Sequence, residues 1–119
     1  MTQSITSETT TNSSTEKEDW QLFIKALRAF PVIAQSLDAI KAEVISARAY
    51  PGAKIPGEIH VYNAHFLQDW CKINGYKLTY KELNDDFYHW EVYVVLYDCL
   101  KVFTLIRDKE KEILENEAV

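Results

Sequence analysis

Hydrophobic residues recur at helical spacing in the N-terminal part of the chain and predict two consecutive helices. The first begins at a capping-box pair, Thr15 and Glu18, and carries apolar residues three or four positions apart as far as Phe30. Pro31 has no backbone N–H, so it ends this helix and suits the first turn of the next one, which extends to Arg48. The pattern therefore predicts a joined pair of helices with a sharp corner at Phe30 and Pro31.

A third helix is predicted between two local signals. Asn63 is a suitable N-cap and Gly75 is a suitable left-handed stop for a segment with apolar residues at helical spacing. Residues 59–62, which precede this segment, alternate polar and apolar positions, and residues 76–78 follow it. These two short segments are compatible with a minor two-stranded ribbon.

The most apolar part of the chain, residues 87–106, decides the predicted fold. Val92, Val94 and Val95 favour a strand. However, no Gly or Pro interrupts about twenty positions, which would be unusually long for a strand. Charged side chains also recur at intervals that place them along one side of a helix, namely Glu91, Asp98, Lys101 and Asp108. We therefore expect a long C-terminal helix that starts near Tyr80.

Together these elements predict an all-α fold, a small bundle of three to four helices with a long C-terminal helix. Residues 1–14 are almost wholly polar, so they cannot bury enough surface to offset the entropy of ordering. We expect a disordered polar tail over residues 1–14 and a single helical domain over residues 15–119. A chain of 119 residues has room for one ordinary core.

Composition and charge narrow the class of function. The chain is 47% hydrophobic and 26% charged with a net charge of −5. This composition is typical of a folded domain. The negative net charge argues against binding to nucleic acids and anionic membranes, because both require a basic protein surface. The longest apolar run, residues 92–97, is far shorter than the ~20 residues of a membrane span, and no signal-peptide pattern is present. We expect a cytoplasmic protein that binds no membrane and keeps Cys71 and Cys99 as reduced thiols.

Motifs for catalysis and cofactor binding are missing from the sequence. Phosphate-binding glycine loops, His-Glu-x-x-His and Gly-x-Ser-x-Gly do not occur, and three glycines could scarcely build such loops. The expectation is a non-enzymatic protein with no cofactor, no metal and no catalytic residue. A metal-dependent enzyme or sensor on His65, Asp69 and His89 is a third hypothesis, since two histidines and a carboxylate could form an open metal site.

Residues 65–90 predict a helix, a glycine turn and a second capped helix, and this segment resembles the helix-turn-helix core of winged-helix domains. The resemblance implies a DNA-binding regulator that uses Lys72, Lys77 and Lys81 around the turn. Its second helix, however, carries one lysine against three acids, which is the wrong balance for contact with phosphates. DNA binding is therefore the alternative hypothesis, and nucleic acid is not the expected partner.

Aromatic residues are abundant, with three Trp, seven Tyr and five Phe. In the predicted C-terminal helix, Trp90, Tyr93 and Tyr97 would form one stripe while a second apolar stripe faces the core. Tyr and Trp are enriched where an apolar surface also meets water or a partner. A second apolar face in so small a chain therefore indicates a protein-binding surface or a dimer seam.

The leading hypothesis is a non-enzymatic protein-interaction module, such as an adaptor, assembly factor or regulator. The acidic C-terminal half favours a protein partner with a basic patch or tail. A homodimer formed through the same aromatic face is the other arrangement that this hypothesis allows. The predicted partner-binding residues are Trp90, Tyr93, Tyr97, Glu91, Asp98, Tyr50 and Tyr62.

Overall fold

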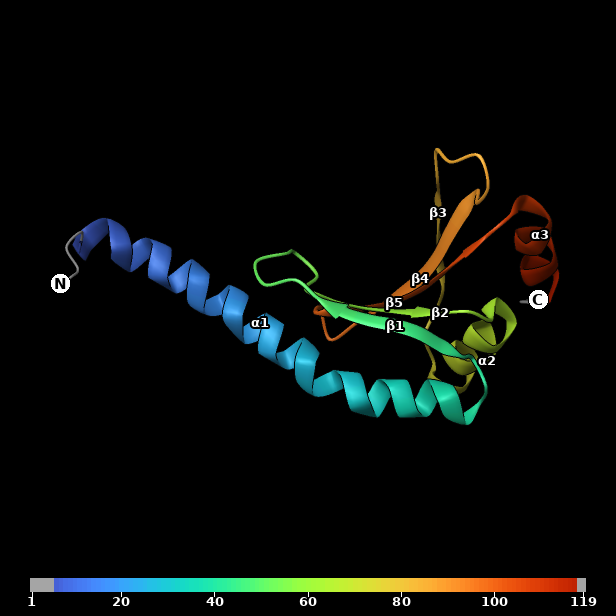
Figure 1. Cartoon of the computed structure of the whole chain (residues 1–119), viewed down its shortest axis with the longest axis horizontal. Helices are drawn as coiled ribbons and strands as arrows, with labels where there is room; N and C mark the ends of the chain where they lie inside the picture. Colours follow the sequence, from blue (N-terminus) through green and yellow to red (C-terminus); the bar gives the residue numbers. More distant parts are fainter. Residues whose placement is uncertain (1–5, 118–119) are drawn as a thin grey trace.

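The computed structural model describes residues 6–117, with side chains described from residue 17 onward. These residues form three helices and one five-stranded sheet (Figure 1). The predicted all-α helical bundle is therefore wrong, because the fold is mixed α/β. The elements in chain order are α1 (Thr6–Ala39), β1 (Val44–Ala49), β2 (Gly57–Val61), α2 (Ala64–Asn74), β3 (Thr79–Glu82), β4 (Trp90–Leu96), β5 (Leu100–Ile106) and α3 (Asp108–Glu117).

The sheet has the strand order β1-β2-β5-β4-β3. Neighbouring strands are antiparallel except for β2 and β5, which run parallel. A tight turn joins β4 to β5, and the Cys99 amide donates to the Leu96 carbonyl across it at 3.1 Å. Its two central residues, Tyr97 and Asp98, have φ values of 55° and 61°. Two left-handed residues in succession define a type I′ turn, which suits a β-hairpin and is formed here without glycine.

This hairpin replaces the long C-terminal helix that we predicted. Alternate positions are buried along both strands, and a period of two is the signature of a strand. The alternation is hidden in the sequence because the intervening positions include Tyr93, Phe103 and Leu105, which are also apolar. The buried positions are Val92, Val94 and Leu96 in β4, and Leu100, Val102, Thr104 and Ile106 in β5.

The core lies between the three helices and one face of the sheet. α1 and α2 cover the larger cluster, and the Trp70 indole Nε1 donates to the Ser36 hydroxyl at 2.8 Å, which joins the two helices. Leu114 of α3 is fully buried in a smaller cluster with Val92 and Ile106. The other face of the sheet has no described helix over it, and we call it the open face.

α1 is one helix, so the predicted corner at Phe30 and Pro31 is wrong. Pro31 lies inside the helix, and the hydrogen bond that it cannot make would go to the carbonyl of Leu27. Both residues are exposed, so water can satisfy that carbonyl. The helix ends at Ala39, and the rest of the predicted second helix forms β1 instead. α1 packs on β1 and β2, and an added Cβ at Gly57 would lie only 2.8 Å from the Ala26 Cβ.

The third predicted helix is confirmed as α2. The Asn63 side chain accepts a hydrogen bond from the Phe66 amide at 3.1 Å, and Gly75 ends the helix in the left-handed region with φ of 76°. A strand in the segment before this helix is also confirmed, as β2. The predicted ribbon is wrong, because β2 pairs with β1 and β5 while residues 76–78 lie outside the strands.

The predicted disordered tail over residues 1–14 stays a prediction. Residues 1–5 lie outside the described residues, and α1 is described from Thr6 without the side chains before residue 17. Within residues 6–117, no helix combines the length and the apolar character that crossing a bilayer requires. The expected cytoplasmic location also stays a prediction.

Candidate functional site

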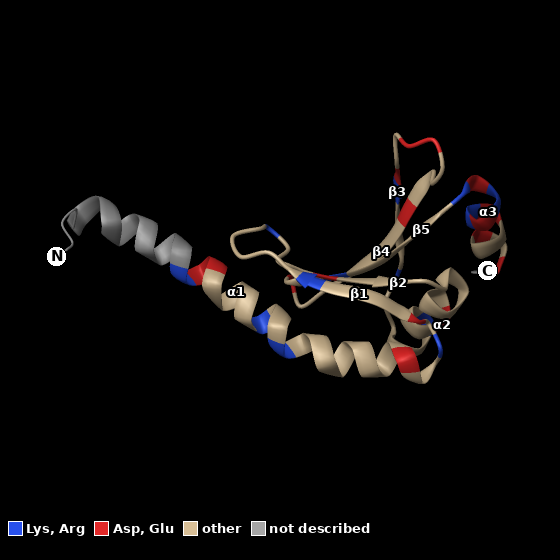
Figure 2. Cartoon of the chain, viewed as in Figure 1, with Lys and Arg blue, Asp and Glu red and all other residues tan. Residues whose placement is uncertain are grey.

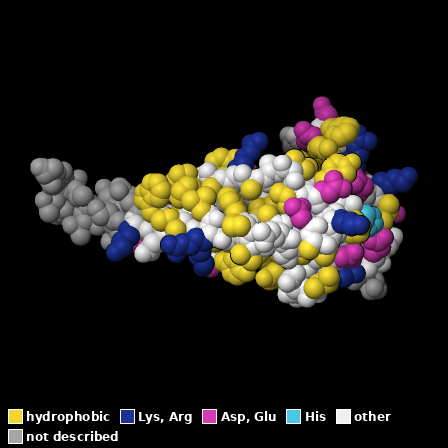
Figure 3. All heavy atoms as spheres, turned by 60° about the horizontal axis from the view of Figure 1, so that its bottom comes forward, with side chains coloured by type: hydrophobic (Ala, Val, Ile, Leu, Met, Phe, Trp, Pro, Cys, Tyr) yellow, Lys and Arg dark blue, Asp and Glu magenta, His cyan; other side chains and the backbone are white. Residues whose placement is uncertain are grey.

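α1 carries a second row of apolar side chains beside the residues that pack on the sheet, and Trp20 at one end of this row lies next to Pro51 and Gly52 of the connection between β1 and β2. Their spacings of four, three and four residues place them on one side of a helix, about 140° from the buried positions such as Ala26 and Ile33. Figure 3 shows hydrophobic side chains gathered next to the grey end of α1. We call this row the outer face of α1, and it consists of Trp20 (53% exposed), Ile24 (41%), Leu27 (42%) and the exposed Pro31.

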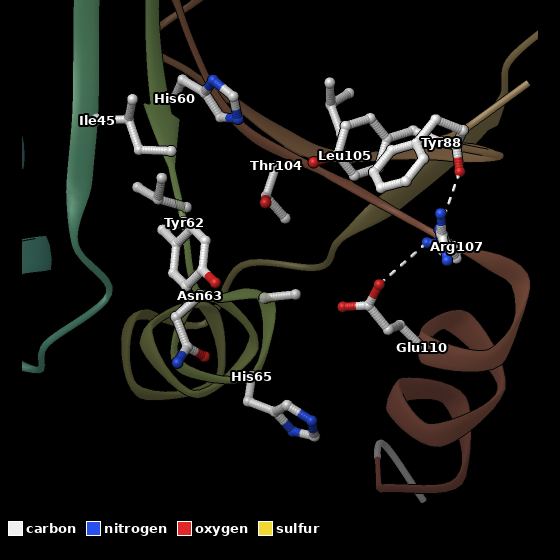
Figure 4. A pocket seen from close by; sticks show the side chains of 13 residues that line it. Ile45, His60, Tyr62, Asn63, His65, Tyr88, Thr104, Leu105, Arg107 and Glu110 are labelled. Atoms are coloured by element: carbon white, nitrogen blue, oxygen red, sulfur yellow. Dashed lines mark hydrogen bonds between the residues drawn. The ribbon is translucent and has the colours of Figure 1, made fainter. Parts of the chain in front are cut away.

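A cavity of about 450 Å³ opens where β2 ends beside β5 (Figure 4). β2 pairs with β5 only as far as His60 and Phe103, so the last three residues of β5 have no strand on that edge. α2 and α3 follow β2 and β5 along the chain, and both helices therefore begin next to the cavity. Small-molecule sites in mixed sheets are often found at the carboxyl ends of parallel strands, where this cavity lies.

Aromatic and aliphatic side chains form much of the cavity wall, and the His60 ring is held by a stacking contact. It stacks on Phe103 with 4.6 Å between centroids and 14° between planes. Burial lowers the pKa of His60 below its usual value of 6.5, so the imidazole is neutral at pH 7 and offers one donor and one acceptor. The other members of this wall are Ile45, Tyr62, Phe87, Tyr88 and Leu105.

Arg107 provides a positive charge at one end of the cavity. Its guanidinium carbon lies 3.8 Å from the centre of the Phe87 ring, and its Nε donates to the Phe87 carbonyl at 3.2 Å. Glu110 also lines the cavity, and its Oε1 accepts a hydrogen bond from the Arg107 backbone amide at 3.2 Å (Figure 4). Among the described residues, the guanidinium takes part in no ion pair.

Thr104 is a buried polar residue on the same wall. Thr104 is only 2% exposed, and it belongs to the row of β5 that faces the helices, where it pairs with Val92 of β4.

The residues of the predicted metal site do not come together. His65 Nδ1 lies 2.7 Å from Glu117 Oε1, whereas His89 Nδ1 lies 3.4 Å from Asp108 Oδ2 at the other end of α3. Asp69 is exposed on α2 and has no ion pair with either histidine. Over residues 6–117, no group of three potential metal ligands occurs.

The two cysteines are free and buried, as expected of reduced thiols. Burial raises the pKa of Cys71 to about 12, and burial also raises the pKa of Cys99. Neither thiol is a thiolate near neutral pH, so neither has the reactivity of a catalytic cysteine.

Trp90, Tyr93 and Tyr97 do not share one face, because β4 is a strand and not a helix. Trp90 points toward the helices, and its indole Nε1 donates to Asp108 Oδ1 at 2.7 Å. Tyr93 is half-buried on the open face opposite Phe103. Tyr97 is 51% exposed in the turn between β4 and β5. Their predicted role in binding a partner stays a prediction, but the stripe that linked them is absent.

The other predicted partner contacts are also dispersed. Glu91 lies on the open face, where its Oε2 is 3.0 Å from the Lys101 ammonium. Asp98 lies in the turn beside Tyr97. The Tyr50 hydroxyl donates to Glu58 Oε1 at 3.4 Å. Tyr62 is 69% exposed at the cavity. Of the seven predicted residues, the structure thus brings Glu91 and Tyr93 onto one face and Tyr97 and Asp98 into one turn, and it separates these pairs from Trp90, Tyr50 and Tyr62.

The structure lacks the second helix that the helix-turn-helix interpretation requires. Residues 79–82 form β3, and the segment from there to β4 is a loop. Lys72, Lys77 and Lys81 are exposed, but they lie on α2, on the connection after it and on β3, so no recognition helix presents them. The helical spacing of Trp20, Ile24 and Leu27 is visible in the sequence, but the sequence does not show which side of α1 packs on the sheet.

No protein-family model matches this sequence, and neither curated proteins nor solved structures give a match. The functional argument therefore rests on the outer face of α1 and on the cavity beside β5.

Proposed function

We propose that this protein is a non-enzymatic protein-interaction module that docks its partner on the outer face of α1. The observation that carries this proposal is a row of exposed apolar side chains on a helix that extends beyond the strands (Figure 1). A continuous apolar row on one side of a helix is typical of helix-to-helix docking. The proposal retains the class of function expected from the sequence and moves the docking surface from the C-terminal half to α1.

The spacing of the outer face favours a second copy of the chain as the partner. If two α1 helices cross antiparallel about a two-fold axis next to residue 25, Trp20 of one copy lies opposite Pro31 of the other. Ile24 then lies opposite Leu27. The row is self-complementary under this symmetry, as an interface between identical subunits requires.

The polar side chains beside the outer face suit the same arrangement. Lys17, Gln21, Arg28 and Gln35 are exposed along one edge of this row. In an antiparallel pair, this edge of one helix lies beside the same edge of the other helix. Each basic residue of one copy then lies nearest a glutamine of the other copy: Lys17 near Gln35 and Arg28 near Gln21. No like-charged pair is forced together, and such pairs would oppose association.

The size of the outer face sets the expected affinity of the dimer. From Trp20 to Pro31 the row covers about 17 Å of helix, which is small against the ~800 Å² that each partner buries in a standard interface. We therefore expect a dimer with a dissociation constant on the order of micromolar or weaker. Acidic residues occur on the loop between β3 and β4 and along α3, in addition to Glu18 and Asp19 of α1 (Figure 2). The predicted partner with a basic patch would bind there and stays a prediction.

Sedimentation velocity over a range of protein concentrations tests this proposal. The wild-type chain should shift from monomer to dimer as its concentration rises. Leu27→Glu should stay monomeric, because it places a charge against Ile24 of the other copy. Val32→Glu is the matched control, since Val32 is 67% exposed on the same helix but lies off the outer face. Far-UV circular dichroism and thermal melts check that both variants fold.

Mixing two charged variants tests the antiparallel register. Ile24→Lys and Leu27→Glu should each be monomeric alone, yet their mixture should dimerise, because position 24 of one copy faces position 27 of the other. A wild-type chain that stays monomeric would reject the second copy as partner. Equal loss of the dimer in Val32→Glu would place the interface elsewhere, and a mixture without rescue would reject the antiparallel arrangement.

A further inference from the structure

A second cavity, of about 440 Å³, lies between α2, α3 and the segment that leads into β3, and we call it the slot. The two helices are neighbours in the fold (Figure 1). Leu78 lines the slot and packs against both core clusters, so the slot opens where the two clusters meet. The inference drawn from it does not depend on the dimer proposed above.

One wall of the slot is a long apolar strip. Tyr76, Leu78 and Tyr80 line it, and they alternate with exposed residues, which places all three on one side of an extended segment. From residue 76 to residue 80 such a segment covers about 13 Å. The buried Cys71 of α2 also lines the slot. A strip of this length matches the shape of an extended hydrocarbon chain.

Two lysines line the slot near the end of α2. Lys72 is in the last turn of that helix, and Lys77 follows Tyr76 directly. The Lys72 Nζ donates to the Glu117 carbonyl at 3.0 Å, and an ammonium group has further donors for a ligand. Among the described residues, neither lysine takes part in an ion pair. This end of the slot therefore carries two positive charges without a counter-charge.

Glu115, the acid in the wall, lies toward the other end of the strip. Burial and the charge of Glu115 both raise the pKa of Tyr80, so the two side chains are close. Glu115 Oε2 is 3.0 Å from Lys111 Nζ, which balances its charge. In the cavity beside β5, Arg107 and Glu110 offset each other. The slot instead has two lysines against one glutamate, and the lysines lie at the end away from that glutamate.

We infer that the slot binds a monocarboxylic acid with an extended apolar chain. The chain lies along Tyr76, Leu78 and Tyr80, where it is removed from water. The carboxylate lies at the end formed by Lys72 and Lys77, where two ammonium groups attract it. A volume of about 440 Å³ falls within the range of small-molecule sites.

Two probe acids that differ in chain length test the inference, octanoate and hexanoate. Binding to the full chain is followed by heteronuclear NMR, in which the amide signals of residues 76–80 should move and saturate. Octanoate should bind about tenfold more tightly than hexanoate, because two further methylene groups leave water. Octanol has the same chain without the charge, and it should bind about fivefold more weakly than octanoate.

Variants of the two lysines should affect the acid and not the alcohol. Lys77→Gln should weaken octanoate by about threefold, and adding Lys72→Gln should bring the loss to about tenfold. Both variants should leave octanol binding unchanged. Lys81→Gln is the matched control for charge, since Lys81 is exposed on β3 and does not line the slot. Far-UV circular dichroism and thermal melts check that all variants fold.

Each other result would overturn a defined part of the inference. If octanoate does not move the signals of residues 76–80 at millimolar concentration, the slot is not a site for such acids. If hexanoate binds as tightly as octanoate, the chain does not lie along the strip. If octanol binds as tightly as octanoate, the lysines do not select a carboxylate. If Lys81→Gln weakens octanoate as much as Lys77→Gln, the attraction is only that of general charge.

Discussion

The two faces of the sheet are both largely shielded from solvent, but different kinds of side chain shield them. The face toward the helices, which we call the covered face, consists of aliphatic residues that are almost wholly buried, including Ile59, Val92, Val102 and Ile106. The open face carries rings and charges that are half-buried although no described helix covers them. Its central residues are His60, Glu91, Tyr93, Lys101 and Phe103.

The open face is organised by specific contacts more than by aliphatic packing. The Lys101 ammonium lies 3.0 Å from Glu91 Oε2 and sits over the Phe103 ring at 4.9 Å and the Tyr93 ring at 5.8 Å. The Lys101 and Glu91 side chains are 24% and 12% exposed, so their charges are partly removed from water. The difference indicates that the covered face holds the fold together, whereas the open face holds polar groups in defined positions.

Two valines in one strand give the largest expected contrast between the faces. Val92 is fully buried on the covered face, and Val95 is 36% exposed on the open face. Val92→Ala should lower the free energy of unfolding by about 2 kcal/mol, because it removes buried methyl groups and leaves a cavity. Val95→Ala should cost less than about 1 kcal/mol. Urea unfolding of both variants measures the difference, and equal losses would show that the two faces are packed alike.

The ion pair on the open face predicts a smaller effect. Glu91→Gln keeps the shape of the side chain but leaves the shielded Lys101 ammonium without its counter-charge. We expect a loss of about 1–2 kcal/mol in the free energy of unfolding, because a partly buried charge that loses its partner is costly.

Glu115→Gln provides the matched control for this prediction. Glu115 pairs with Lys111 at the same distance of 3.0 Å, but its side chain is 53% exposed. Removing such an exposed pair should cost less than about 0.5 kcal/mol. If the two variants lose equal stability in urea unfolding, the environment of the open face does not strengthen its ion pair.

The contrast between the two faces also helps to explain which elements could be predicted from the sequence. α2 was predictable because its two ends are set locally, by the Asn63 cap and by Gly75 in the left-handed region. The hairpin of β4 and β5 was not predictable, because the open face supplies apolar rings at the positions where a half-exposed strand normally carries polar residues. Its turn at Tyr97 and Asp98 contains no glycine to mark it.

The candidate functional sites could not be predicted from the sequence for a similar reason. The helical spacing of Trp20, Ile24 and Leu27 was visible in the sequence, but which side of α1 packs on the sheet depends on strands that come later in the chain. The cavity could not be found from sequence, since its wall combines residues from Ile45 to Glu110 that only the strand order brings together. Local patterns predict single elements, whereas surfaces built from distant strands require the register of the sheet.

His60, where the open face meets the cavity, gives the smallest predicted effect, a loss of stability in mild acid. Burial of the ring lowers the pKa of His60, with Arg48 adding to this shift and Glu58 and Glu91 opposing it. The unfolded chain therefore takes up a proton near pH 6.5 while the folded chain does not. Stability should be complete above about pH 6.5 and should fall as the pH drops below it.

His60→Phe isolates this effect, because phenylalanine keeps a ring against Phe103 but cannot titrate. Urea unfolding of both proteins between about pH 7.5 and pH 5 gives the difference in their free energies of unfolding. Every other titrating group is shared, so its contribution largely cancels in that difference. The wild-type chain should lose stability relative to the variant only below about pH 6.5. A difference that stays constant over the whole range would mean that the ring titrates alike in both states, and that the open face leaves it as accessible to water as the unfolded chain does.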